Sequence, residues 1–114
     1  EQDLRRRHPR FEPENWEKNR KLVQAFNALA KNANVSPAQL ALAWVLSRGS
    51  HVHAIPGTRS IAHWQENHAA LQADYSPDVF KQVDRLFEQQ AVAGHRYPES
   101  IRHTIDTEDF EVAW

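Results

Sequence analysis

The chain has 114 residues, of which 40% are hydrophobic and 25% are charged, a composition typical of a folded domain with one modest core. Its 14 Lys and Arg residues balance 15 Asp and Glu residues, so nothing in the global charge favours binding to nucleic acid or to an anionic membrane. No apolar run approaches the ~20 residues that cross a bilayer. The absence of Cys excludes disulfide bonds and suits a reducing compartment, so we expect a cytoplasmic protein.

The first part of the chain predicts a loop followed by a long helix. Residues 1–12 are rich in Arg and lack apolar periodicity, which indicates an exposed loop. From Pro13 onward apolar residues recur at helical spacing, and a proline is well placed in a first helical turn, so we expect a helix over 13–32. Its apolar residues are Trp16, Leu22, Val23, Phe26, Leu29 and Ala30.

The middle of the chain predicts a second helix and a short strand. In the stretch Ser36-Pro37-Ala38-Gln39, the serine hydroxyl can accept a hydrogen bond from the third helical amide, and the Gln39 side chain can reach back to the cap. This capping pattern predicts a helix over 37–48, ended by Gly49. Val52 to Ile55, flanked by turn residues, predicts a strand over 52–55.

Two further helices and a polar tail complete the prediction. Ser60 can cap a helix over 61–72, and the Ser76-Pro77 pair opens a helix that reaches about residue 92. Residues 94–114 are polar with scattered aromatic residues and predict an extended arm. Trp16, Trp44 and Trp64 lie on apolar helix faces and are expected to pack in the interior, whereas Trp114 is available to dock elsewhere.

These elements form an incomplete set for an independent domain. A single strand leaves its hydrogen-bonding edges unpaired, because a sheet needs at least one partner strand. The sequence also contains no Met, although translation starts with one. We therefore expect either a processed chain or a piece of a longer protein, with the missing strands supplied by the rest of that protein or by another chain.

The stretch "IPGTRS" groups residues that suit an anion. Gly57 lets the backbone turn or approach a ligand closely, Thr58 adds a hydroxyl, and Arg59 adds a planar guanidinium. The first free amides of the helix predicted after Ser60 point in the same direction. These residues suit a phosphate site, but many strand-to-helix turns carry an exposed Arg, so Gly-Thr-Arg alone does not decide between a phosphate site and an ordinary turn.

Other chemistries find less support in the sequence. His51 and His53 would share one face of a strand, whereas His63 and His68 differ by five positions and diverge on a helix. With no Cys and no compact group of His and carboxylate residues, we expect no metal site. Ser, His and Asp are all present, but no nucleophile-elbow motif accompanies them, so acyl transfer is not indicated either.

Several blocks of the sequence together resemble one enzyme family. "SPAQLALAWVLSRG", "HVHAIPGTRSIAHWQENHAAL" and "SPDVFKQVDRLF" resemble the C-terminal third of an aldo-keto reductase, and "PRFEPENWEKNRKLV" and "AVAGHRYPE" extend the likeness to about Glu99. Members of that family are (β/α)8 barrels that reduce aldehydes and ketones with NADPH. The resemblance implies that residues 52–55 form the last barrel strand and residues 61–72 the last barrel helix, with an extra C-terminal helix after them.

The expected fold is therefore mainly α, as the C-terminal fragment of an α/β (β/α)8 TIM barrel. The chain is expected to form a single partial domain over 1–114, with about four helices and one short strand. This domain comprises a loop over 1–12, a helical region over 13–93 that contains the strand 52–55, and a C-terminal arm over 94–114.

The resemblance also implies a set of cofactor-binding residues. The family binds the adenosine 2′-phosphate of NADP(H) at the turn that Gly57, Thr58 and Arg59 occupy here. Glu66 and Asn67 match the "EN" pair that contacts the adenine. His63 stands where relatives often have Arg or Gln near the nucleotide.

The catalytic residues of the family find no match in this chain. Aldo-keto reductases use an Asp, Tyr, Lys and His tetrad supplied by earlier strands and loops, and neither Tyr75 nor Tyr97 matches the catalytic Tyr. We therefore expect an isolated chain without activity, from a parent enzyme that uses NADPH and a small carbonyl substrate. By family analogy, residues 1–12 and the tail after Gly94 contribute to the substrate site.

Three alternatives to a cofactor-binding part of a reductase stay open at this point. The chain can be an inert truncated fragment whose uncovered apolar helix faces cause self-association. It can be a module that keeps only adenosine-phosphate recognition. It can also be an unrelated helical interaction domain, in which "IPGTRS" is only a turn.

Overall fold

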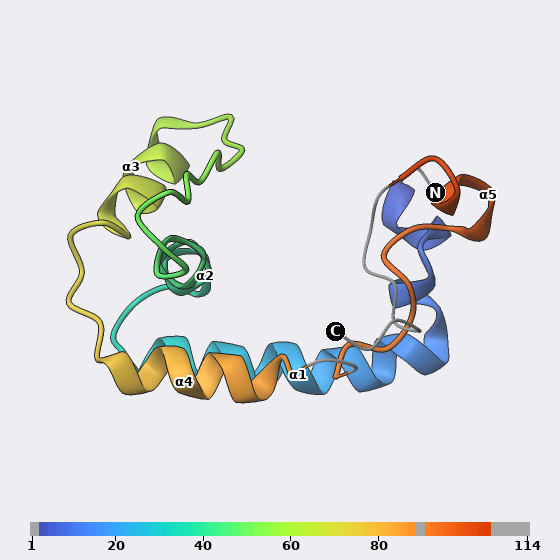
Figure 1. Cartoon of the computed structure of the whole chain (residues 1–114), viewed down its shortest axis with the longest axis horizontal. Coiled ribbons are helices and arrows are strands. Elements are labelled where there is room, and N and C mark those ends of the chain that lie inside the picture. Colours follow the sequence, from blue (N-terminus) through green and yellow to red (C-terminus); the bar gives the residue numbers. More distant parts are fainter. Residues whose placement is uncertain (1–2, 89–90, 106–114) are drawn as a thin grey trace. The chain divides into compact units, whose positions relative to one another are not determined.

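The computed structural model describes residues 3–88 and 91–105, and this part of the chain is mainly helical (Figure 1). The chain divides into two compact units: a terminal unit of Glu1–Gln24 with Leu86–Trp114, and a central unit of Ala25–Arg85. In chain order the helices are the 3-10 helices η1 (Leu4–Arg7) and η2 (Pro9–Phe11), and the α-helices α1 (Pro13–Asn32), α2 (Pro37–Leu46), α3 (Ile61–Ala69), α4 (Pro77–Leu86) and α5 (Glu99–Arg102).

Residues 4–7 and 9–11 form helical turns where a loop was expected. The Asp3 carboxylate caps η1 by accepting a hydrogen bond from the Arg5 amide at 3.0 Å, and it also pairs with the Arg5 guanidinium at 2.6 Å. These contacts hold the pKa of Asp3 down at about 2. Pro9 then opens η2 with its backbone already restricted to helical φ. Local capping of this kind makes single turns without any apolar periodicity, which is why the pattern of the sequence did not indicate them.

The capping pattern at Ser36 is present as expected. The Gln39 amide donates to Ser36 Oγ at 3.2 Å, and the Ser36 amide donates to Gln39 Oε1 at 2.9 Å. α2 ends at Leu46, two residues earlier than expected. The side chains of Ser47 and Arg48 both donate to the carbonyl of Trp44, so side chains rather than further helical amides satisfy this carbonyl at the end of the helix.

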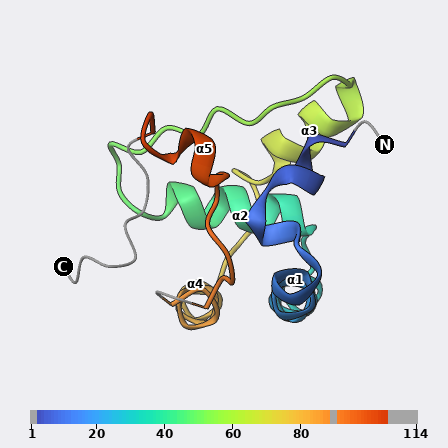
Figure 2. The same ribbon diagram turned by 90° about the vertical axis from the view of Figure 1, so that its right-hand side faces the viewer.

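The core of the central unit lies where α1, α2 and α4 meet. Figure 2 views α1 and α4 nearly end-on, with α2 lying across them. Four buried side chains, Ala30, Leu40, Val79 and Val83, form the centre, and only Leu40 and Val83 among the larger ones are fully enclosed. Packed around them are Phe26, Leu29, Ala33, Val35, Trp44, Tyr75 and Phe80.

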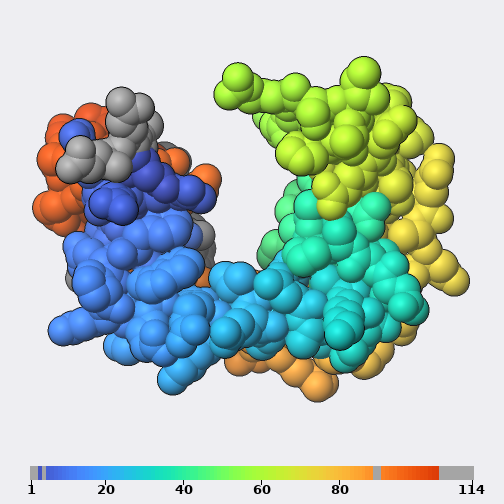
Figure 3. All heavy atoms as spheres, turned by 180° about the vertical axis from the view of Figure 1, so that it is seen from behind, coloured from blue at the N-terminus to red at the C-terminus, as the bar shows by residue number. Residues whose placement is uncertain are grey.

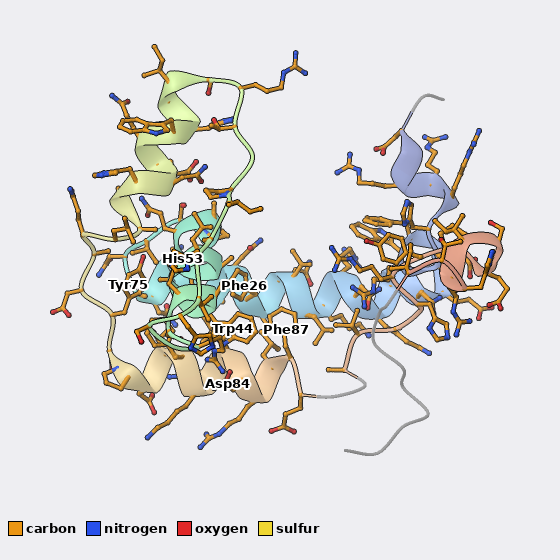
Figure 4. All side chains as sticks on the ribbon, turned by 45° about the horizontal axis from the view of Figure 1, so that its top comes forward. Phe26, Trp44, His53, Tyr75, Asp84 and Phe87 are labelled. Atoms are coloured by element: carbon orange, nitrogen blue, oxygen red, sulfur yellow. The ribbon has the colours of Figure 1, made fainter. Side chains whose placement is uncertain are left out.

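A polar cluster joins α2 to α4 beside this core. Trp44 Nε1 donates to Asp84 Oδ1 at 2.8 Å (Figure 4). The Arg48 guanidinium forms an ion pair with the same carboxylate at 3.0 Å and lies 4.5 Å from the centre of the Trp44 ring. The hydrogen bond from Trp44, followed by the contacts of Arg48, lowers the pKa of Asp84. Asp84 is therefore held in its ionised form as the partner of two α2 side chains.

The strand expected over 52–55 is absent from the described residues, and this prediction was wrong for the chain. A strand is defined by hydrogen bonds to a neighbour, and no other described segment forms a ladder with these residues. Val52 and Ala54 are partly buried while Ile55 is 96% exposed, so the segment keeps an alternation of faces without a sheet.

The later helices are shorter than expected. α3 ends at Ala69 rather than near residue 72, because the amides of Ala70 and Leu71 turn to carbonyls only three residues back and tighten the last turn. α4 ends at Leu86 rather than near residue 92. Within the tail expected to be extended, α5 forms a short helical turn with an ion pair between Glu99 and Arg102. The expectation for Trp114 lies outside the described residues.

Two of the three Trp residues expected in the interior are largely at the surface. Trp16 is 42% exposed and stacks on Phe11, and Trp64 is 56% exposed and stacks on His68. Trp44 alone of the three packs against the buried core. Apolar spacing on a helix shows which face can pack, but it does not show whether a partner surface is present.

Among the described residues, none of the helices combines the length and the apolar character that a membrane crossing requires.

Candidate functional site

The loop before α3 is held by its own side chains. Thr58 Oγ1 donates to the carbonyl of Ser60 at 3.0 Å, and the Ser60 amide approaches the same hydroxyl at 3.4 Å. Residues 55–60 are all exposed. In Figure 3 the loop and α3 appear as yellow-green spheres that project from the rest of the central unit. The predicted phosphate-binding turn therefore lies open to solvent, with Thr58 fixing its shape.

The start of α3 offers unused amides. Ser60 is extended and its Oγ accepts from the amide of His63 at 3.1 Å, while the Trp64 amide donates to the Ser60 carbonyl at 3.0 Å. The amides of Ile61 and Ala62 precede these bonds, and no acceptor in the described residues takes them. The positive end of the helix dipole is thus available to an anion.

Gly57 and Arg59 flank this helix start. A Cβ atom built on Gly57 would meet no atom within 4 Å, so contacts within the described chain do not require glycine at this position. Arg59 is exposed and makes no hydrogen bond or ion pair with a described residue. No Asp or Glu occurs between His51 and Gln65, so the local charge is positive.

The other predicted residues lie along α3 itself. His63, Glu66 and Asn67 are three and four positions apart and so share one side of the helix. His63 is exposed, whereas Glu66 and Asn67 are partly buried. The carbonyl of Glu66 accepts a hydrogen bond from Gln39 Nε2 at 3.3 Å, which ties this part of α3 to the start of α2.

A hollow of about 330 Å³ is lined by residues of α2, of α3 and of the segment 52–58, and we call it the α2–α3 hollow. Of the predicted site residues, Thr58 and Asn67 line it. The stacked rings of Trp64 and His68, with centroids 5.4 Å apart, also contribute to its lining. The remaining lining residues are mostly apolar: Leu42, Leu46, Val52, His53, Ala54, Pro56 and Leu71.

The sequence did not indicate this hollow, although it contained a partial signal. Ile61, Trp64, His68 and Leu71 have the spacing of a stripe on one face of a helix, but a stripe does not reveal which surface faces it. The structure brings Thr58 and Asn67 to the hollow. Among residues 3–88 and 91–105, no three His, Asp or Glu side chains come close enough together to hold a metal ion.

Comparison with known proteins assigns the chain to a family. A sequence model of the Aldo/keto reductase family matches residues 1–88, and the chain belongs to this family. It is 38% identical over 98 residues to an aldo-keto reductase of Schizosaccharomyces pombe, yakc, whose name specifies NADP(+); the match covers 86% of this chain and 29% of that protein. It is 40% identical over 96 residues to probable aldo-keto reductase 1 of Glycine max, covering 84% of this chain and 28% of that protein.

The chain thus spans less than a third of the length of these relatives. No solved structure matches it significantly.

Proposed function

We propose that this chain is the C-terminal, cofactor-binding part of an NADP(H)-dependent aldo-keto reductase, an oxidoreductase that reduces small aldehydes and ketones. One observation carries the proposal. Arg59, which has no partner among the described residues, stands two residues before the open amides at the start of α3. In the whole enzyme, the central unit forms the last part of a (β/α)8 barrel. The absence of Cys fits a cytoplasmic enzyme.

The proposed site recognises the adenosine end of the cofactor. The guanidinium of Arg59 and the first amides of α3 hold the 2′-phosphate, with about 1.5–3 kcal/mol for a hydrogen bond to a charged group and about 0.3–1 kcal/mol for the helix terminus. Gly57 leaves room for the phosphate beside the backbone, and Thr58 keeps the turn in place.

The residues on α3 meet the base. The carboxamide of Asn67 can donate to and accept from the N7 and N6 edge of adenine, which carries the complementary acceptor and donor. The Glu66 carboxylate can accept from the same amino group. His63 lies one turn nearer the helix start, where it adds a donor beside the phosphate.

A titration with nucleotides tests this assignment. We expect 2′,5′-ADP to shift the amide NMR signals of Gly57, Arg59 and Ile61, and 5′-AMP, which lacks the 2′-phosphate, to shift them far less. Binding should be weak, because the rest of the cofactor site lies outside this chain and the open loop must be ordered on binding. Equal responses to the two nucleotides would refute the phosphate assignment.

The chain by itself should not catalyse hydride transfer. The Asp, Tyr, Lys and His tetrad of the family has no match in the sequence, so no catalytic residue is assigned. Tyr75 serves the core instead, stacking on Phe80 and donating to the carbonyl of Gln39 at 3.4 Å, and burial raises its pKa. We expect no NADPH oxidation by the purified chain with a reactive aldehyde; turnover above a buffer control would contradict this.

A second proposal is that the chain self-associates. Several large apolar side chains of the loop and α3 are uncovered: Ile55 is 96% exposed, Ile61 77%, Leu71 67% and Trp64 56%. Such a patch is costly in water and favours a second surface. Sedimentation velocity should show dimers or larger species that grow with concentration. A folded chain that stays monomeric throughout would rule this out.

We propose, by analogy with the family, that residues 1–12 and the tail after Gly94 contribute to the substrate side of the whole reductase. The residues that carry the chemistry of reduction lie outside this chain, so these two segments would act on substrate choice rather than on hydride transfer.

A further inference from the structure

Asn19, on the terminal-unit part of α1, is a buried polar residue, with 8% of its surface exposed. Its Nδ2 donates to the carbonyls of Arg10 at 3.0 Å and Ala93 at 2.8 Å, and its Oδ1 accepts from the Ala93 amide at 2.8 Å. The carboxamide thus makes with Ala93 the reciprocal pair of hydrogen bonds that a residue of a neighbouring antiparallel strand would make. The Asn19 side chain thus supplies the backbone of Ala93 with the two hydrogen bonds that a neighbouring strand would otherwise supply.

Other contacts join the same two segments, residues 8–11 and 93–97. Arg10 Nε donates to the carbonyl of Gly94 at 3.2 Å, and His8 Nδ1 lies 2.9 Å from the carbonyl of Arg96. Asn15, one turn before Asn19 on α1, holds the first segment on the helix by donating to the carbonyl of Pro9 at 2.9 Å. In Figure 1 the orange trace of the second segment passes beside the blue trace of the first.

The approach of the segments leaves no room for a side chain at Gly94. Its φ is +83°, which favours glycine, and a Cβ atom there would lie 2.7 Å from Asn15 Nδ2 and 2.9 Å from the carbonyl carbon of Pro9. The backbone of the second segment therefore lies directly against the first. This contact requires glycine, so it forms only in the register that places Gly94 there.

The register determines which side chains meet at the surface. The rings of His8 and Tyr97 have centroids 6.2 Å apart, and the guanidinium carbon of Arg96 lies 5.4 Å from the centre of the Tyr97 ring. Arg96 is exposed, while His8 and Tyr97 are partly buried. An aromatic ring and a cation are thereby presented together by segments that are distant in sequence.

We propose that Asn19 is a positioning residue: its carboxamide fixes the register of residues 93–97 on residues 8–11 and so sets the cluster of His8, Arg96 and Tyr97. The connection of this cluster to substrate choice rests on the proposed function. The register itself does not, because it concerns hydrogen bonds within the terminal unit alone.

Amide hydrogen exchange of the whole chain, followed by NMR, tests the proposal. In Asn19→Ala the Ala93 amide loses its acceptor, and two carbonyls lose their donor. We expect exchange of the Ala93 amide to become about 10- to 100-fold faster and the contacts between the His8 and Tyr97 rings to vanish from NOE spectra. Asn19→Asp has the same shape but cannot donate when ionised, so its contact with the two carbonyls should be lost and the ring contacts with it.

Asn27→Ala is the matched control, because Asn27 lies exposed on the same helix. It should leave the Ala93 amide and the ring contacts unchanged. Unchanged ring contacts in Asn19→Asp would overturn the proposal. So would faster exchange that extends equally to Leu40 and Val83, since Asn19 would then act on stability as a whole. Neither result depends on whether the chain binds NADP(H).

Discussion

Replacing Arg59 by alanine should weaken the binding of 2′,5′-ADP by at least about tenfold, and by up to about 150-fold if the guanidinium makes a full charge-assisted bond to the phosphate. Arg59 makes no hydrogen bond or ion pair with a described residue, so its loss should cost little stability. The measurement is a titration followed by NMR, in which the shift of the Gly57 amide reports on the turn.

Two controls separate recognition of the phosphate from a general loss of charge. Arg85→Ala removes the same charge from an exposed position on α4 and should leave the affinity for 2′,5′-ADP unchanged. Arg59→Lys keeps the charge without the planar fork and should fall between the wild type and Arg59→Ala. If Arg85→Ala weakens binding as much as Arg59→Ala, the nucleotide responds to net charge, and the proposed site is wrong.

Replacing Leu40 by alanine should lower the free energy of unfolding of the central unit by about 2–5 kcal/mol. Leu40 is completely buried between α1, α2 and α4, and only one other large side chain of the core, Val83, is enclosed to the same degree. A core this small has few other contacts to compensate for the cavity. This loss is comparable with the whole stability of a marginal domain.

Urea unfolding followed by circular dichroism at 222 nm measures this effect. Leu71→Ala removes the same atoms from a side chain that is 67% exposed, and at a protein concentration where sedimentation shows monomers its effect should stay within about 0.5 kcal/mol. Similar losses for the two variants at higher concentrations would mean that Leu71 is covered in solution, as self-association through α3 would require. An unchanged midpoint in Leu40→Ala would contradict the assignment of the core.

The parts of the fold that could be predicted depend on neighbours in sequence. The cap at Ser36 needs only Gln39, three residues away, and the helix start at Ser60 needs only His63. A strand at 52–55 instead needs a distant partner strand. The alternation of its side chains carries no information about such a partner, and no partner strand lies among the described residues. The sequence did not indicate η1 for a different reason. The Asp3 carboxylate caps this single turn, which needs no apolar periodicity.

In the candidate site, too, the features set by sequence neighbours could be predicted and those set by distant contacts could not. Gly57, Thr58 and Arg59 are consecutive, so their grouping was visible in the sequence, and the structure adds the Thr58 contact that shapes their turn. The α2–α3 hollow could not be predicted, because it depends on how two helices pack. The role of Asn19 was also hidden, since the residue it contacts most closely, Ala93, is 74 positions away.

Gln39 holds two elements with one carboxamide. Its oxygen completes the cap of α2 by accepting from the Ser36 amide, and its nitrogen donates to the carbonyl of Glu66 in α3. Glutamate would complete the cap equally well, since the capping pattern accepts either residue. Its second oxygen would, however, face the Glu66 carbonyl, and two acceptors repel. The choice of Gln over Glu at position 39 therefore depends on a helix that begins more than twenty residues later in the chain.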